Sequence, residues 1–128
     1  ERLAVARALG VPSASFLENF YQAGLTTKEA MESGDISRAC IESAPNKAIK
    51  SPPSLDHRYM HEDVGYGLVP FAAFGDLAGV ETPTIDALIH VASAMMGLDF
   101  AHDGLTLEKM GLAGLKPDDL ARFVEQGA

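Results

Sequence analysis

The feature that most constrains the fold is a run of apolar residues with helical spacing between Thr82 and Met96. The run follows the i, i+3, i+4, i+7 spacing that places side chains on one face of an α-helix. Its members are Ile85, Leu88, Ile89, Ala92, Met95 and Met96. Three further apolar residues widen this face, namely Ala87, Val91 and Ala94. With Thr82 as its cap and Pro83 at its first position, we expect this helix to be mostly buried.

Shorter helical patterns fill most of the remaining chain. We expect helices over 1–9, 14–23, 27–33 and 36–42, an apolar helix reaching Leu77, a turn over 107–110 and a last helix from Pro117. Ser13 is expected to cap the second helix, and Thr26, three residues before Glu29, has the spacing of a capping box. Residues 43–54 hold three prolines and are expected to be irregular. No segment alternates as a β-strand does, so the predicted fold class is all-α.

Length, composition and charge limit the number of domains and the kinds of partner. The chain has 128 residues, of which 47% are hydrophobic and 22% charged, so we expect one domain, 1–128, with a sizeable core. Eighteen acidic against ten basic residues give a net charge of −8, which repels a phosphate backbone. We therefore expect no nucleic-acid partner.

Cysteine content and hydropathy indicate the compartment. Cys40 is the only cysteine, which excludes an intramolecular disulfide and fits a reducing compartment. The longest nearly uncharged stretch, 64–80, is broken by glycines and is shorter than the ~20 apolar residues of a membrane-spanning helix. We therefore expect a cytoplasmic protein without a membrane partner, with Cys40 a small buried apolar residue and His90 a core or interface histidine.

The glycines of GYGLVP, at 65–70, superficially resemble a dinucleotide-binding motif. A Rossmann site needs a strand, a glycine turn and a helix in that order, with a third glycine where this chain has Pro70. We expect instead that these glycines allow close helix packing or a bent helix start, and that no cofactor binds here.

His57 and His61 are four residues apart, as metal ligands on one helix face are. The glutamate of the zinc-protease signature would have to stand where Arg58 stands, and a cation beside the first ligand disfavours a bound metal. We expect no metal site.

Arg58 and Asp63 are the candidate site residues. A guanidinium offers a planar fork for a substrate carboxylate, and a carboxylate can orient and stabilise a histidine that acts as acid or base. Five residues apart, the two do not share a face of one regular helix. The structural alternative, which spacing alone favours, is a cap and a salt bridge that hold the start of a helix.

The segment 51–89 as a whole resembles the C-terminal helical domain of the octopine/nopaline (opine) dehydrogenases. Its most specific part is HRYMHEDVGYGLVP, at 57–70, and the resemblance extends to ERLAVARALGV at the start and LTLEKMGLAGL downstream. It implies an all-α domain of the 6-phosphogluconate-dehydrogenase C-terminal-like type, which partners an N-terminal Rossmann domain that this chain lacks. That domain would bind NAD or NADP, and the enzyme would join an amino acid to a 2-oxo acid by reducing their imine.

The resemblance also implies roles for single residues. Arg58 matches the arginine that engages a substrate carboxylate, and Asp63 matches the catalytic aspartate paired with a histidine upstream of this chain. Tyr59 and Glu62 match the pattern with structural roles. The chain by itself is then expected to be inactive, and a homodimer is among the expected partners.

Two other functions stay open. One is the helical domain of a hydroxyacid or ketopantoate-type dehydrogenase, which needs no amine. The other is a non-catalytic helical dimerisation module. Exposure of Arg58 and Asp63 away from any pocket would favour the module, and apolar surface left exposed over 64–96 would indicate a missing domain or subunit.

Overall fold

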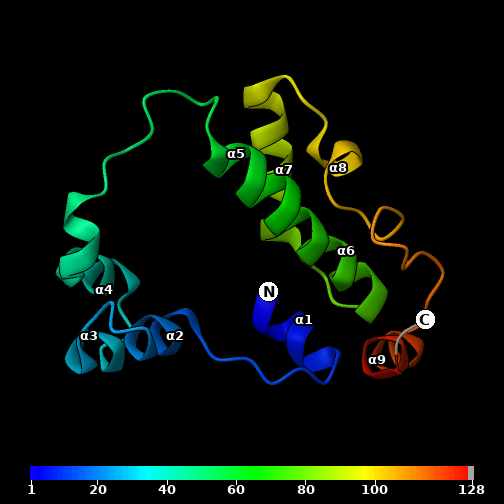
Figure 1. The fold of residues 1–128 in the computed structure, drawn as a ribbon, viewed down its shortest axis with the longest axis horizontal. Coiled ribbons are helices and arrows are strands. Elements are labelled where there is room, and N and C mark those ends of the chain that lie inside the picture. The colour runs from blue at the N-terminus through cyan, green and yellow to red at the C-terminus, as the bar shows by residue number, and fades with distance from the viewer. Residues whose placement is uncertain (127–128) are drawn as a thin grey trace. The chain divides into compact units, whose positions relative to one another are not determined.

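A computed structural model describes residues 1–126, whose regular elements are all helical, with no strand among them (Figure 1). The elements are α1 (Arg2–Ala8), α2 (Phe16–Gln22), α3 (Lys28–Glu32), α4 (Ile36–Glu42), a 3₁₀ turn η1 (Ala44–Ala48), α5 (Arg58–Asp63), a π-helical turn η2 (Val64–Leu68), α6 (Val69–Ala78), α7 (Pro83–Met96), α8 (Phe100–Asp103) and α9 (Pro117–Gln126). The predicted all-α class is confirmed. The helices form two compact units, one of residues 12–51 and one of residues 1–11 with 52–128.

The 12–51 unit packs α2, α3 and α4 around Phe20, Ala30 and Ala39. The helix over 36–42 lies where the sequence predicts it, but two caps differ. Ser15, two residues after the predicted Ser13, caps α2 in a capping box with Glu18. Thr27 caps α3, because its neighbour Thr26 donates its hydroxyl to the Ala39 carbonyl instead.

Cys40 corrects another expectation. It is exposed on α4 rather than buried. Ala39 takes the inward position of α4, since the helix turns its neighbour by about 100° out of the contact face.

The other unit is built on α5, η2 and α6, which continue into one another, with α7 packed alongside (Figure 1). Its core consists of apolar side chains from this run and from α7 and α8, namely Val64, Val69, Ile85, Ile89, Ala92 and Phe100. No helix among residues 1–126 is both long and apolar enough to cross a membrane.

The π turn follows from Pro70, which has no N–H to donate to a carbonyl one turn back. The Val69 N–H reaches back five residues to the Val64 carbonyl, as a π turn requires. The Gly65 carbonyl, which Pro70 leaves without its helical donor, accepts the N–H of Leu105 at 2.8 Å. Gly65 and Gly67 lie within this turn, and their role in close helix packing or a bent helix start stays a prediction.

Gly104 makes this contact sterically feasible. A Cβ atom there would lie 2.6 Å from the Phe100 carbonyl oxygen, 2.7 Å from that of Gly65 and 2.9 Å from a Val69 methyl group. Backbone atoms cannot swing aside as side-chain ends do, so only glycine fits between α8 and η2.

The long helix α7 has a cap that comes from a distant part of the chain. Thr82 makes no capping bond to its backbone, and the Glu1 carboxylate accepts the N–H groups of Thr84 and Ile85, each at 2.8 Å. Partial loss of water around Glu1 opposes ionisation, but these hydrogen bonds outweigh it and hold the pKa of Glu1 below its ordinary value.

The expectation that α7 is mostly buried is wrong. Only Ile85, Ile89 and Ala92 are buried, because η2, α6 and α8 cover one side of α7. On the uncovered side Leu88, Val91 and Met95 are each 52% exposed.

We predict that Gly104→Ala lowers the free energy of unfolding by about 1–3 kcal/mol, the usual cost of overpacking, because the added methyl group meets two carbonyl oxygens. Urea unfolding measures this loss of stability. Gly67→Ala is the matched control, since its Cβ would lie 3.9 Å from the nearest atom. Equal destabilisation by both substitutions would contradict this packing.

Acid should weaken the cap of α7. A carboxyl whose folded pKa lies below the unfolded value, about 4.3 for glutamate, contributes stability above that value and loses it as pH falls through the folded pKa. The urea concentration at the midpoint of unfolding should fall between about pH 5 and pH 3. We predict that this fall is smaller in Glu1→Ala than in the wild type. Glu81→Ala, which removes another exposed carboxylate, is the control and should leave the drop unchanged. A drop that Glu1→Ala does not reduce would argue against the cap.

Candidate functional site

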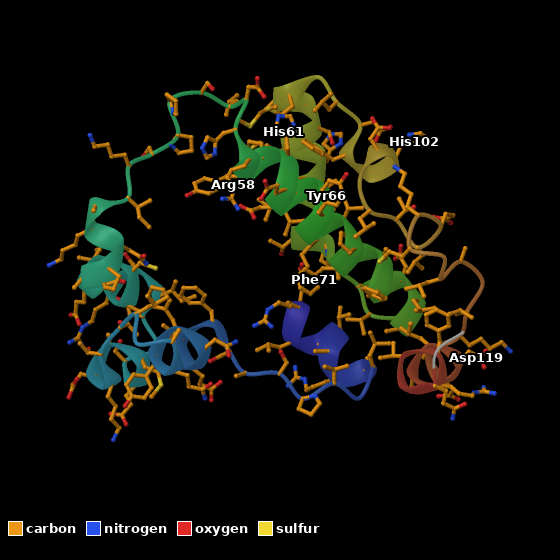
Figure 2. The ribbon with its side chains drawn as sticks, viewed as in Figure 1. Arg58, His61, Tyr66, Phe71, His102 and Asp119 are labelled. Carbon is orange, nitrogen blue, oxygen red and sulfur yellow. The ribbon has the colours of Figure 1, made fainter. Side chains whose placement is uncertain are left out.

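Arg58 begins α5 and lies in the exposed row of that helix (Figure 2). Its Nη2 and Nε atoms donate to the Glu62 Oε2 atom at 2.9 and 3.2 Å, and the two side chains are 68% and 57% exposed. The i,i+4 spacing of the two residues is the sequence signal for this pair. Glu62 thus holds the guanidinium over α5 and leaves one of its faces to solvent.

Asp63 ends α5 and is also exposed. Among the hydrogen bonds and ion pairs of residues 1–126, none involves its carboxylate. Val64 follows it into the core, so the backbone that carries Asp63 is fixed while its side chain stays open to a partner.

The run of helix continues past Asp63 through the π turn into α6. Gly67 and Phe71 follow Asp63 at steps of four residues, and Tyr66 follows Arg58 and Glu62 at the same step. Tyr59, Tyr66 and Phe71 are 45%, 65% and 37% exposed. Figure 2 shows Arg58, Tyr66 and Phe71 in succession along this run of helix. We call this exposed side, from Arg58 to Phe71, the α5–α6 face.

The structural alternative for Arg58 and Asp63, a cap and a salt bridge that hold the start of a helix, is seen only in part. A salt bridge does span α5, but it joins Arg58 to Glu62. The cap is His57, whose Nδ1 accepts the Tyr59 N–H at 3.3 Å. Asp63 contributes to neither.

The other imidazole of the segment is held separately. The Nε2 atom of His61 lies 2.8 Å from Asp56, and its ring meets the edge of Phe100. Over the described residues no three ligand-type side chains come together in a way that would hold a metal ion.

Neither of two hollows in the described part of this unit is lined by Arg58 or Asp63. The larger, about 570 Å³, lies between α6, α7 and α8 and includes Asp76, Asp86, His90 and Asp99. His90 is exposed there. The smaller lies beside Arg58, at the start of α5. Arg58 and Asp63 therefore lie on an open face, as in the interaction-module alternative, and not inside a cavity of this unit.

The residues of GYGLVP do not fit a dinucleotide. They form the π turn between two helices, and the carbonyl of Gly65 is bonded to Leu105. A phosphate cradle requires free backbone N–H groups at the start of a helix that follows a strand, and this segment follows α5.

Comparison with known proteins identifies relatives. Residues 1–96 match the family model described as NAD/NADP octopine/nopaline dehydrogenase, alpha-helical domain. An opine dehydrogenase of Arthrobacter sp. (strain 1C) is 37% identical over 98% of this chain and 33% of its own length. Vitopine synthase of Allorhizobium ampelinum is 28% identical over 91% of this chain and 31% of its own length.

A third relative is matched over a shorter stretch. Tauropine dehydrogenase of Arabella iricolor is 30% identical over 54% of this chain and 17% of its own length. The chain thus spans at most about a third of the length of these relatives.

The exposure of the α5–α6 face generates a prediction about stability. Exposed i,i+4 ion pairs contribute about 0.3–0.5 kcal/mol, and surface substitutions usually change stability by no more than about 0.5 kcal/mol. We predict that Arg58→Ala and Asp63→Asn each change the free energy of unfolding by at most about 0.5 kcal/mol, measured by urea unfolding. A loss of several kcal/mol would make these residues part of the folding core.

Proposed function

Since the chain belongs to the octopine/nopaline dehydrogenase family, we propose that it is the substrate-binding helical domain, 1–128, of a two-domain NAD(P)-dependent oxidoreductase. The reaction proposed for the whole protein is reductive condensation of an amino acid with a 2-oxo acid. The observation that carries this proposal is the α5–α6 face, where a cation and an unpaired carboxylate lie exposed on a rigid helix. An open face of this kind is suited to a site completed by another domain.

Arg58 is the proposed substrate-binding residue. Its guanidinium is oriented by Glu62 through one oxygen atom, so it keeps donors for an incoming carboxylate. Both proposed substrates carry carboxylates, and a planar fork binds such a group through two parallel hydrogen bonds.

Asp63 is the proposed catalytic partner of a histidine in the rest of the protein. A carboxylate beside an imidazole stabilises its protonated form, and reduction of an imine needs a proton donor near the new amine. The lack of a partner for Asp63 among the described residues supports this role, because a carboxylate already paired within α5 would not be available.

The cofactor, NAD or NADP, is proposed to bind mainly to the part of the protein outside this chain. The π turn at 64–68 supports this assignment, since Gly65 and Gly67 lie inside that turn and not in a loop at the start of a helix. The relatives' greater length leaves room for an N-terminal Rossmann domain. The uncovered side of α7, with Leu88, Val91 and Met95, supports packing against such a domain or a second copy, and the homodimer stays a prediction.

Oxidation of NADH or NADPH by the full-length protein tests the reaction. We expect oxidation when a 2-oxo acid and an amino acid are supplied together, and little with either alone. Oxidation with the 2-oxo acid alone would instead favour the hydroxyacid or ketopantoate-type dehydrogenase. No oxidation with any pairing, in a protein that folds and binds NAD(P)H, would favour the interaction module.

Two substitutions test the residue roles in the full-length enzyme. Arg58→Ala should mainly raise KM for the substrate whose carboxylate it binds, by about tenfold or more, as expected for the loss of a charged hydrogen bond. Asp63→Asn should mainly lower kcat and change its pH profile, since the histidine loses its anionic partner. Wild-type kinetics in both variants would refute the site.

A further inference from the structure

The smaller hollow at the start of α5 has a volume of about 350 Å³. We call it the proline hollow. Its lining consists of Pro52, Pro53, Ser54, Leu55, His57, Tyr59 and Met60. All of these residues belong to the same unit as Arg58, and Met60 is anchored in the core of that unit.

Two polar side-chain atoms of the lining are bonded locally. The Ser54 hydroxyl donates to the Asp56 carbonyl at 3.3 Å, and the His57 Nδ1 accepts the Tyr59 N–H. The two prolines have no N–H to offer. Pro52, Pro53, Leu55 and Met60 supply apolar surface, and the Tyr59 ring is set against the His57 ring at a centroid distance of 4.5 Å.

Carboxylates are absent from the residues that line the proline hollow. The nearest one in the chain, Asp56, is turned to His61 at 2.8 Å. A cationic group placed in the hollow would lose hydration without gaining an ionic partner, which is unfavourable, whereas an apolar group would gain by leaving water.

The hollow is next to the proposed carboxylate-binding residue in the chain. Two of its lining residues, His57 and Tyr59, are the immediate sequence neighbours of Arg58. In an α-amino acid the carboxylate and the side chain leave the same carbon atom, so a substrate held at Arg58 projects its side chain only a few ångströms away. Proline fixes φ and restricts the residue before it, which gives the hollow a stiff wall suited to selecting shape.

We propose that the proline hollow receives the side chain of the amino-acid substrate and selects uncharged, apolar side chains over cationic ones. This inference rests on the proposed function. Leu55 is its chief specificity-determining residue, because it is 46% exposed, lies outside any helix and is uninvolved in the core.

Steady-state kinetics of the full-length enzyme test this proposal. The ratio of kcat/KM for leucine to that for arginine is measured with saturating pyruvate and NAD(P)H, in the wild type and in Leu55→Glu. We expect the wild type to prefer leucine. Leu55→Glu should lower the ratio about tenfold or more. Its carboxylate would pair with the guanidinium of the arginine substrate and would make the hollow less favourable for the apolar side chain of leucine.

Two further variants sharpen the result. Ile41→Glu places the same charge at a residue that is 71% exposed on α4 and does not line the hollow, and it should leave the ratio unchanged. Leu55→Ala widens the hollow without charge and should shift preference toward phenylalanine. Urea unfolding of each variant controls for folding.

The outcomes separate this inference from the function on which it rests. The proline hollow is supported if the enzyme condenses amino acids with pyruvate, and if its preference for leucine over arginine is lost in Leu55→Glu but kept in Ile41→Glu. An active enzyme whose ratio is unaffected by both Leu55 variants, or equally changed by Ile41→Glu, overturns the hollow while leaving the proposed function standing. A protein that condenses no amino acid with any 2-oxo acid overturns both.

Discussion

The hydrogen bond from the Leu105 N–H to the Gly65 carbonyl is the interaction on which the α5–α6 run depends. It satisfies a backbone acceptor that Pro70 leaves without a donor inside the helix, which would otherwise be a cost in a buried turn. The bond also ties α8 to the π turn, and glycine at 104 is the condition for the two backbones to approach. A local defect in the helix is thereby converted into a tertiary contact.

The same turn borders the residues that are proposed for the chemistry. π turns are often found at functional sites. Here the turn lies immediately after Asp63, in a run of helix that exposes Arg58, Asp63, Tyr66 and Phe71. Arg58 is positioned by Glu62, while Asp63 keeps its carboxylate open. The backbone of this surface is held in a packed helix, which suits the binding role proposed for it.

Local signals predicted more of the fold than tertiary ones. The bounds of α4, the glycine after α2 and the start of α9 at Pro117 follow from apolar spacing, positive-φ glycine and proline at a first turn. The cap of α7 by Glu1 spans more than eighty residues and has no sequence period, so spacing could not find it. The burial of α7 was overestimated because an apolar stripe does not say which neighbour covers it, and part of that stripe is open in this unit. Arg58 and Asp63 came from a family pattern, whereas their exposure and the partner role of Glu62 required coordinates.

The central claim is that this helical unit serves a reaction that joins an amine to a 2-oxo acid. The most direct measurement is the identity of the product formed by the full-length protein from a ¹⁵N-labelled amino acid, pyruvate and NAD(P)H, by mass spectrometry and NMR. The account predicts a secondary amine that retains ¹⁵N and both carbon skeletons. A hydroxy acid formed beside unchanged labelled amino acid would contradict it.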